Sequence, residues 1–259
     1  MARLLTLGRE PALRRTWPDY RNLGLTQRHV PELIRMATDS ALLQAEEWSA
    51  ASLGPLHAWR ALGQLEAAAA AAPLFALLER EVDDVAVYDE IPKVLGMIGP
   101  PSLPQATLWL FDEERNEHLR IAAAHILTEV AHEYPDRRDE AVAVLVQQLR
   151  DWPHQSPALN GFLIAYLAEL GEVAAAPLIE AAYLGGAVDL GVHGDWEDVQ
   201  VDLGLLEERV TPPTPGSYFD PDADHGPGRA RTPSRHAAAS AKARRKAEKK
   251  ARKRNRKRK

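Results

Sequence analysis

A repeated nine-residue pattern limits the folds that this chain of 259 residues can adopt. Four segments align without gaps, and their starts lie 33, 32 and 40 residues apart. The segments are Ala58–Glu66, Ile91–Gly99, Ala123–Ala131 and Leu163–Gly171. Each has apolar or small residues at its first, fourth, fifth and eighth places, a spacing that forms one face of an α-helix. Intervals of 32–40 residues between copies are typical of stacked helical units, so the pattern predicts a helical-repeat fold.

A second helix is expected after each copy. The four stretches are Pro73–Glu79, Leu103–Phe111, Ala141–Leu149 and Pro177–Leu184. Most begin at or near a proline, which suits the first turn of a helix because the N–H that proline lacks has no partner there. We find no alternating strand pattern of useful length, and one further helix is expected from Asp195, a suitable N-cap. The expected fold is therefore all-α, an α-solenoid of about five antiparallel helix pairs over residues 29–206.

The fifth place of every copy is a leucine, and these leucines are the predicted core residues of successive layers. They are Leu62, Leu95, Leu127 and Leu167. Small residues flank them in the repeat and permit close approach of the helices. We therefore expect all four side chains to be buried.

The core pattern of the copies, small-x-x-[AV]-L-G-x-[LI]-G before a proline-led second helix, resembles the HEAT repeat family. It resembles in particular the bacterial HEAT-like repeats related to those of phycobilisome lyases, and the resemblance covers about residues 29–185. Ile91–Gly99 and Leu163–Gly171, followed by Pro104 and Pro177, carry it. The third copy and the 40-residue interval depart from the pattern. The resemblance implies a superhelix whose second helices line a concave surface, but its motif consists of packing residues and does not specify a function.

The third place of each copy points away from the predicted core, and three copies carry a basic residue there: Arg60, Lys93 and His125. In the register of the HEAT family these side chains form a basic column on the concave face. Such a column binds a carboxylate, a phosphate or an acidic peptide. The alternative is local neutralisation, because Asp89 precedes Lys93 by four residues and Glu129 follows His125 by four.

Charge is divided unevenly along the chain. Residues 1–228 hold 16 basic and 36 acidic residues, a formal charge of −20, whereas residues 229–259 hold 16 basic residues and one acid, a charge of +15. This asymmetry predicts a polyanion-binding tail on an acidic folded body. The tail residues expected to bind are Lys242, Arg244, Arg245, Lys246, Lys249, Lys250, Arg252, Lys253, Arg254, Arg256, Lys257, Arg258 and Lys259.

The tail contains no aromatic side chain that would stack on bases, so we expect sequence-independent contact with RNA, DNA or the ribosome. The alternative is that the tail folds back onto the acidic body. The predicted organisation is a lead-in segment (1–28), the HEAT-like α-solenoid (29–206), a disordered linker rich in Pro, Gly and Asp (207–236) and a basic low-complexity tail (237–259).

Composition narrows the possible chemistry. The absence of cysteine excludes disulfides, thiolate metal sites and cysteine nucleophiles. The longest apolar run, Ala67–Leu78, has twelve residues, fewer than the about 20 that a membrane span needs, so we expect a soluble, cytoplasmic protein that makes no membrane contact. Phosphate-binding glycine loops and nucleophile elbows are absent from the sequence. We predict no cofactor, no metal and no catalytic residue.

The favoured function is a non-enzymatic scaffold that binds an unidentified protein or peptide on its concave face, with its tail tethered to nucleic acid or the ribosome. The resemblance implies two enzymatic alternatives. One is a HEAT-like lyase or lyase accessory subunit, which attaches a chromophore to a cysteine of its partner. The other is a HEAT-like DNA glycosylase, which needs a basic concave face and is disfavoured by the charge of −20 on residues 1–228.

Overall fold

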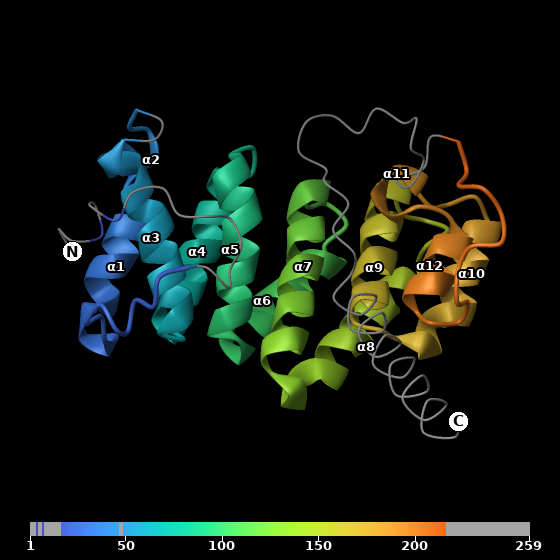
Figure 1. Ribbon diagram of the computed structural model, residues 1–259. Helices are drawn as coiled ribbons and strands as arrows, with labels where there is room; N and C mark the ends of the chain where they lie inside the picture. Colours follow the sequence, from blue (N-terminus) through green and yellow to red (C-terminus); the bar gives the residue numbers. More distant parts are fainter. Residues whose placement is uncertain (1–3, 5–6, 8–16, 47–48, 216–259) are drawn as a thin grey trace, which may run out of the picture. The chain divides into compact units, whose positions relative to one another are not determined.

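The computed structural model describes residues 4, 7, 17–46 and 49–215, and every regular element in these residues is helical (Figure 1). The α-helices are α1 (Val30–Ala37), α2 (Ser40–Leu43), α3 (Ala50–Gln64), α4 (Ala71–Arg80), α5 (Val85–Ile98), α6 (Leu103–Phe111), α7 (Glu117–Glu133), α8 (Arg138–Leu149), α9 (Pro157–Glu169), α10 (Ala176–Leu184), α11 (Leu190–His193) and α12 (Trp196–Asp202). The 3₁₀ turns are η3 (Gln27–His29), η4 (Ala68–Ala70), η5 (Pro100–Ser102), η6 (Pro135–Arg137) and η7 (Val173–Ala175). The chain divides into two compact units, Met1–Val142 and Ala143–Lys259, which we treat as separate bodies. The expectation of an all-α fold is confirmed for the described residues.

The helices that carry the four copies share one way of starting. Each begins at a polar N-cap whose side chain accepts a hydrogen bond from a backbone N–H of the first turn: Ser49 for α3, Asp84 for α5, Asn116 for α7 and Ser156 for α9. A cap of this kind is worth about 1 kcal/mol. The second helices α4, α6, α8 and α10 follow, each after a 3₁₀ turn, and they contain all four stretches expected as second helices.

In the first unit, the helices of the first three copies pack in series. α3 contacts α5, and α5 contacts α7; α1 packs against α3, α4 against α5, and α6 against α7. Two glycines reveal the register: a Cβ at Gly63 would lie 3.0 Å from Sδ of Met97, and a Cβ at Gly96 would overlap the Cβ of Glu129. Each glycine is the sixth residue of its copy, and each facing residue is the seventh of the next copy. Successive copies therefore stack with the same offset, and glycine at the sixth place permits the close approach.

The four predicted core leucines are completely buried. Leu62, Leu95 and Leu127 in the first unit and Leu167 in the second each have 0 % of their surface exposed. This confirms the helical face assigned to every copy, including the third, which departs from the family pattern.

Leu95→Ala is expected to lower the free energy of unfolding by about 2–5 kcal/mol, because it leaves a cavity where α5 packs against α3, α4 and α7. Urea denaturation followed by circular dichroism measures the change. Val85→Ala is the control, since the Val85 side chain begins the same helix but is 75 % exposed. Equal losses from the two substitutions would contradict the assigned core.

In the second unit, α9 packs against α11 and α12, and α10 packs against α12. Asp195 caps α12 as predicted and accepts hydrogen bonds from the backbone N–H groups of Glu197 and Asp198 at 3.1 and 3.3 Å. After α12 the chain turns back, and Arg209 and Thr214 hydrogen-bond to Asp195. Of the predicted linker, which begins at residue 207, the structure describes the residues up to 215. The remainder of the predicted linker and the whole basic tail lie outside the described residues.

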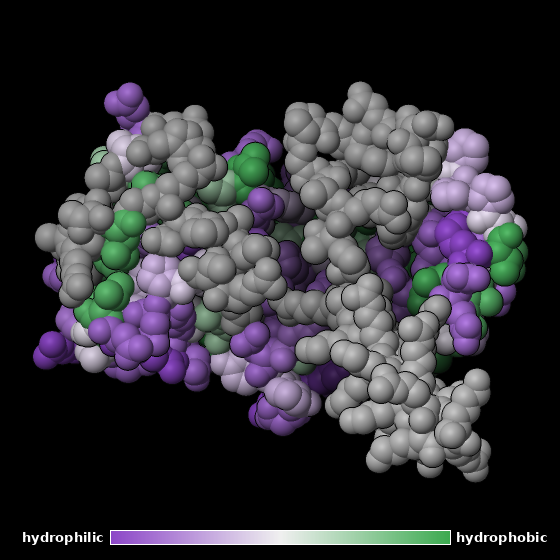
Figure 2. Space-filling model, in the orientation of Figure 1, coloured by the Kyte–Doolittle hydropathy of each residue, from purple (hydrophilic) through white to green (hydrophobic). Residues whose placement is uncertain are grey.

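Exposed large apolar side chains occur on several elements. They are Val85, Leu108 and Phe111 in the first unit and Val173, Leu184, Leu205 and Val210 in the second. On the face shown in Figure 2, hydrophilic residues cover much of the coloured surface between hydrophobic ones. Single exposed apolar residues are normal on a protein surface and by themselves indicate no site. Within the described part of the chain, no helix combines the length and apolar character that crossing a membrane requires.

Candidate binding groove

The end of the lead-in segment lies against α3 in the first unit. The Gln64 side chain holds it at two points: its Nε2 donates to the carbonyl of Pro18 at 2.9 Å, and its Oε1 accepts from the backbone N–H of Tyr20 at 2.8 Å. The Tyr20 hydroxyl lies 2.7 Å from Nδ1 of His57, and both side chains are completely buried. These contacts fix the lead-in segment to the helix that carries the first copy.

Arg60 lies buried between this segment and α5. Its Nε and Nη2 donate to the two carboxylate oxygens of Glu90 at 3.2 and 2.8 Å, and 1 % of the residue is exposed. The ring of Trp17 lies against the guanidinium, with 4.5 Å from its centroid to Cζ, as in a cation–π contact. Among the described residues, Nη1 of Arg60 and Nε1 of Trp17 are buried without a hydrogen-bond partner. The first side chain of the expected basic column is thus a buried structural group.

The expectation of an exposed basic column is not met at Arg60. The stacking register places Arg60 against Glu90, directly before the second copy, and the non-repeated residue Trp17 covers the guanidinium. Lys93 is half-buried, and Nε2 of His125 lies 3.6 Å from a carboxylate oxygen of Glu129. The structure therefore does not bring the three residues together as one exposed basic surface. Of the two local pairs expected as the alternative, the His125–Glu129 contact is present, whereas Arg60 pairs with Glu90 of the next helix.

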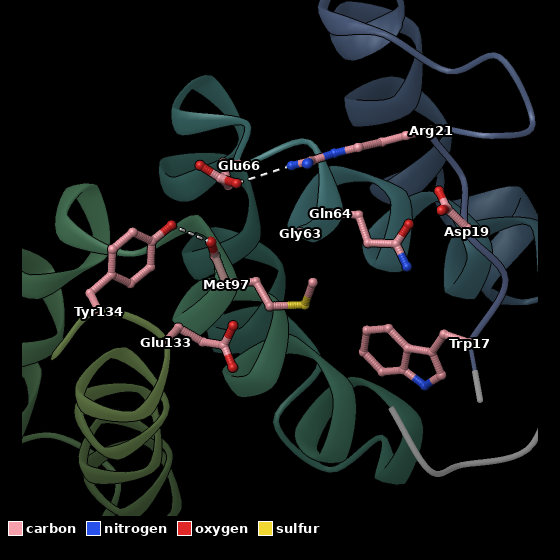
Figure 3. Close-up of a pocket in the computed structure, with 9 residues that line it drawn as sticks. All are labelled: Trp17, Asp19, Arg21, Gly63, Gln64, Glu66, Met97, Glu133 and Tyr134. Carbon is pink, nitrogen blue, oxygen red and sulfur yellow. Dashed lines mark hydrogen bonds and ion pairs between the residues drawn. The ribbon is translucent and has the colours of Figure 1, made fainter. Parts of the chain in front are cut away.

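An open groove lies beside the buried ion pair, across the ends of α3, α5 and α7 (Figure 3). Its volume is about 490 Å³. The nine residues that line it are Trp17, Asp19, Arg21, Gly63, Gln64, Glu66, Met97, Glu133 and Tyr134. In Figure 3, the Met97 side chain lies between Glu133 on one side and Trp17 on the other. The groove thus combines an apolar middle at Met97 with a polar rim drawn from the lead-in segment and the ends of α3 and α7.

The charged groups of the groove are mainly acidic. Three carboxylates, those of Asp19, Glu66 and Glu133, line it together with one basic side chain, Arg21. Arg21 Nη2 donates to Glu66 Oε1 at 3.0 Å, and both side chains of this pair are more than half exposed. The surrounding chain has the same sign: residues 17–142 contain 21 acidic and 10 basic residues, a formal charge of −11. A cationic group is the complementary ligand for this surface.

Tyr134 forms one wall of the groove, and the position of its ring depends on Gly99. Its hydroxyl donates to the carbonyl of Met97 at 2.7 Å, which ties the end of α7 to the end of α5. Gly99 has φ of 82°, and a Cβ there would overlap the Tyr134 ring. Glycine is therefore required both for the backbone conformation that ends α5 and for the approach of the ring.

Sequence reasoning missed this groove because its residues come from places the repeat pattern does not mark. Trp17, Asp19 and Arg21 precede the repeats, and Glu133 and Tyr134 follow the third copy. The seventh place of each copy, which holds Gln64 and Met97, is the signal that could have indicated it. That place lies at the contact between neighbouring helices and borders the groove.

Comparison with known proteins adds no identity: no protein-family model, no curated protein and no solved structure matches the chain. In the part of the chain that the structure describes, no three His, Asp or Glu side chains are grouped so that they could hold a metal ion. The predicted tail residues, Lys242 to Lys259, lie outside the described residues. The groove in the first unit is therefore the site from which a function is argued.

Proposed function

We propose that this protein is a non-enzymatic helical-repeat scaffold that binds a basic segment of a partner protein in the groove of the first unit. The observation that carries the proposal is the groove itself, which Met97 of α5 lines together with three carboxylates: Asp19 of the lead-in segment, Glu66 just after α3 and Glu133 at the end of α7. Its volume of about 490 Å³ falls within the roughly 300–1,000 Å³ that is usual for binding pockets. Because the groove is open, it suits a few side chains of an extended segment rather than an enclosed small molecule.

The Arg21–Glu66 pair indicates how such a segment would be accommodated. An exposed ion pair contributes about 0–1 kcal/mol, so a cation of the ligand can replace Arg21 beside Glu66 at little cost. Methionine adapts its shape to different neighbours, and the half-buried Met97 gives the groove an apolar surface for the aliphatic part of a Lys or Arg side chain. The partner is therefore a protein segment with Lys or Arg, where the sequence had favoured an acidic ligand.

The repeat register supports an α-solenoid of about five antiparallel helix pairs of HEAT type as the wider architecture. The contacts Gly63–Met97 and Gly96–Glu129 repeat one offset across α3, α5 and α7. Repetition of a constant offset is how solenoids build an extended binding surface from neighbour contacts.

The tail remains the proposed contact to nucleic acid or the ribosome. The charge of +15 on residues 229–259 supports binding to phosphates without regard to base sequence. The DNA glycosylase alternative is disfavoured by the formal charge of −11 on residues 17–142. A lyase or lyase accessory subunit would be recognised by a coloured ligand that co-purifies with the protein.

Short fluorescent peptides test the groove. We expect an Arg-containing peptide to bind the full chain more tightly than the same peptide with neutral citrulline, measured by fluorescence anisotropy. The double substitution Glu66→Gln/Glu133→Gln should weaken binding about 2- to 30-fold, as for the loss of two exposed charge pairs of about 0.2–1 kcal/mol each.

The matched control is Glu113→Gln/Glu114→Gln, which removes two exposed acids from the same unit but outside the groove. It should leave the affinity for the Arg peptide nearly unchanged. Equal weakening by both double variants would indicate non-specific attraction to an acidic surface. If neither double variant weakens binding, the groove is not the site.

A further inference from the structure

The segment Arg209–Thr214, here called the clasp, is held on α12 by charge-assisted hydrogen bonds in the second unit. Arg209 donates from Nη1 to Oδ1 of Asp195 at 2.7 Å and from Nη2 to Oδ2 at 2.9 Å. The same guanidinium lies 2.5 Å from Oδ1 of Asp198 and 3.4 Å from Oε2 of Glu197. One cation is thus shared among three carboxylates.

Two threonine hydroxyls complete the clasp. Oγ1 of Thr211 donates to Oε2 of Glu197 at 2.6 Å, and Oγ1 of Thr214 donates to Oδ2 of Asp195 at 2.7 Å. The backbone N–H groups of Val210 and Thr211 donate to Glu197, each at 3.1 Å, and that of Thr214 donates to Asp195 at 3.3 Å. In each of these contacts the clasp supplies the hydrogen, and α12 or its N-cap Asp195 supplies a carboxylate.

The acceptors carry negative charge at neutral pH. Burial disfavours the ionised form of Asp195, but hydrogen bonds from Arg209 and Thr214 outweigh it and hold the pKa of Asp195 well below its usual range. The hydroxyl of Thr211 and the backbone N–H groups lower the pKa of Glu197. Burial raises the pKa of Asp198 despite its contact with Arg209. A further anion next to these groups would meet strong repulsion.

We infer that Thr211 and Thr214 are phosphorylation sites, and that a phosphate on either hydroxyl opens the clasp. Phosphorylation removes the proton that the hydroxyl donates and adds a charge of about −1.5 to −2 at pH 7. The guanidinium of Arg209 is already bound to Asp195 and Asp198, and it also donates to the carbonyls of Thr211 and Pro212. The phosphate would therefore face the carboxylates of Glu197 and Asp195 while the charge of Arg209 is already shared among the carboxylates, a setting in which phosphorylation disrupts a contact.

The threonines are placed where a modifying enzyme can reach them. Thr211 is exposed, Thr214 is half-buried, and neither lies in a helix. Each is followed by a proline, Pro212 and Pro215, and a residue before proline favours extended backbone. In the modification, a kinase transfers the γ-phosphoryl group of a nucleoside triphosphate to Oγ1. The new O–P bond forms as the bond to the leaving nucleoside diphosphate breaks, and the hydroxyl proton passes to a base of the kinase.

Opening the clasp would change the attachment of the basic tail. Release of residues 209–215 adds seven residues to the chain between α12 and the tail, a reach of up to roughly 23–25 Å. The site would thus regulate how far the basic residues extend from the second unit. This inference does not depend on what the groove in the first unit binds.

The physical effect is tested on the full-length protein with phosphothreonine introduced at position 211 or 214. Amide exchange by NMR reports on the hydrogen-bonded N–H groups of Val210, Thr211 and Thr214. We expect them to exchange at least about tenfold faster with phosphothreonine, since a lost hydrogen bond to a charged group changes an equilibrium by that factor or more. Thr211→Val, which removes the donor without adding charge, should have a smaller effect, and Arg209→Gln gives the reference for an open clasp. Unchanged exchange in both phosphorylated proteins would overturn the inference.

The modification itself is tested by mass spectrometry of the segment containing residues 209–215, from protein purified from its own cells during growth, starvation and stress. We expect phosphate on Thr211, Thr214 or both in at least one condition. Its absence from both residues in all three conditions would overturn the assignment as phosphorylation sites, even if the engineered phosphate opens the clasp.

Discussion

Glu90→Ala is expected to lower the free energy of unfolding of the first unit by about 3–5 kcal/mol, the usual result of removing one partner of a buried ion pair. The Arg60 and Glu90 side chains are 2 % and 7 % exposed, and the pair is bidentate. Without Glu90, the guanidinium would be left beside the Trp17 ring, and an aromatic contact of this kind contributes only about 0.5–2 kcal/mol. Urea denaturation of the full chain, followed by circular dichroism, measures the loss.

The double variant Arg60→Met/Glu90→Leu distinguishes charge from packing. Replacing a buried ion pair with apolar residues of similar size is often neutral or stabilising by about 1–4 kcal/mol, so the double variant should be at least as stable as the natural chain. If Glu90→Ala costs less than about 1 kcal/mol, the pair behaves like a solvated surface pair. If the double variant is as unstable as the single one, shape rather than charge holds α3 to α5.

The helices and their core were predictable because they repeat. Leu62, Leu95 and Leu127 occupy one place of a pattern that recurs, and a place on a helical face that is apolar in every copy faces the core. The same reasoning did not reveal why the first and second copies have a glycine, Gly63 or Gly96, at their sixth place. That reason lies in the contact with the next helix, which a single sequence does not display.

The predicted basic column is not exposed at Arg60, where the first copy of the repeat packs against the lead-in segment. Arg60 and Lys93 hold equivalent places, yet Arg60 is buried by Trp17 and Glu90 whereas Lys93 is half-buried. A place that points away from the core of its own layer is exposed only if nothing else covers it. The lead-in segment has no periodicity that would indicate where it packs, and so the groove it helps to form was also not predicted.

The contacts at the start of the linker could not be predicted for a related reason. Composition rich in proline and acidic residues predicts disorder because it provides few apolar side chains to bury. Residues 209–214 make hydrogen bonds to Asp195 and Glu197, which lie 12 to 19 residues before them in the sequence. Hydropathy or charge averaged over a short window does not indicate that Arg209 pairs with the acidic residues at the start of α12.

The basic tail is expected to give the protein a salt-dependent affinity for RNA and DNA. If the tail engages 6–10 phosphates, the affinity should fall by about 10³–10⁵-fold between 50 and 200 mM salt, because each neutralised phosphate releases bound counterions. The affinity should not depend on base sequence, since residues 229–259 contain no aromatic side chain that could stack on a base. Titration of labelled RNA and duplex DNA at a series of salt concentrations measures both properties.

Deletion of residues 229–259 distinguishes nucleic-acid binding from self-docking. It removes 16 basic residues and one acid, and should abolish binding while leaving the melting temperature nearly unchanged if the tail makes no stabilising contact with the acidic body. The opposite pair of results is a substantially lower melting temperature after deletion and no binding of nucleic acid by the full chain at low salt. That outcome would show that the tail's charge of +15 acts on the body itself, whose residues 1–228 carry −20, and the proposed tether to nucleic acid or the ribosome would be wrong.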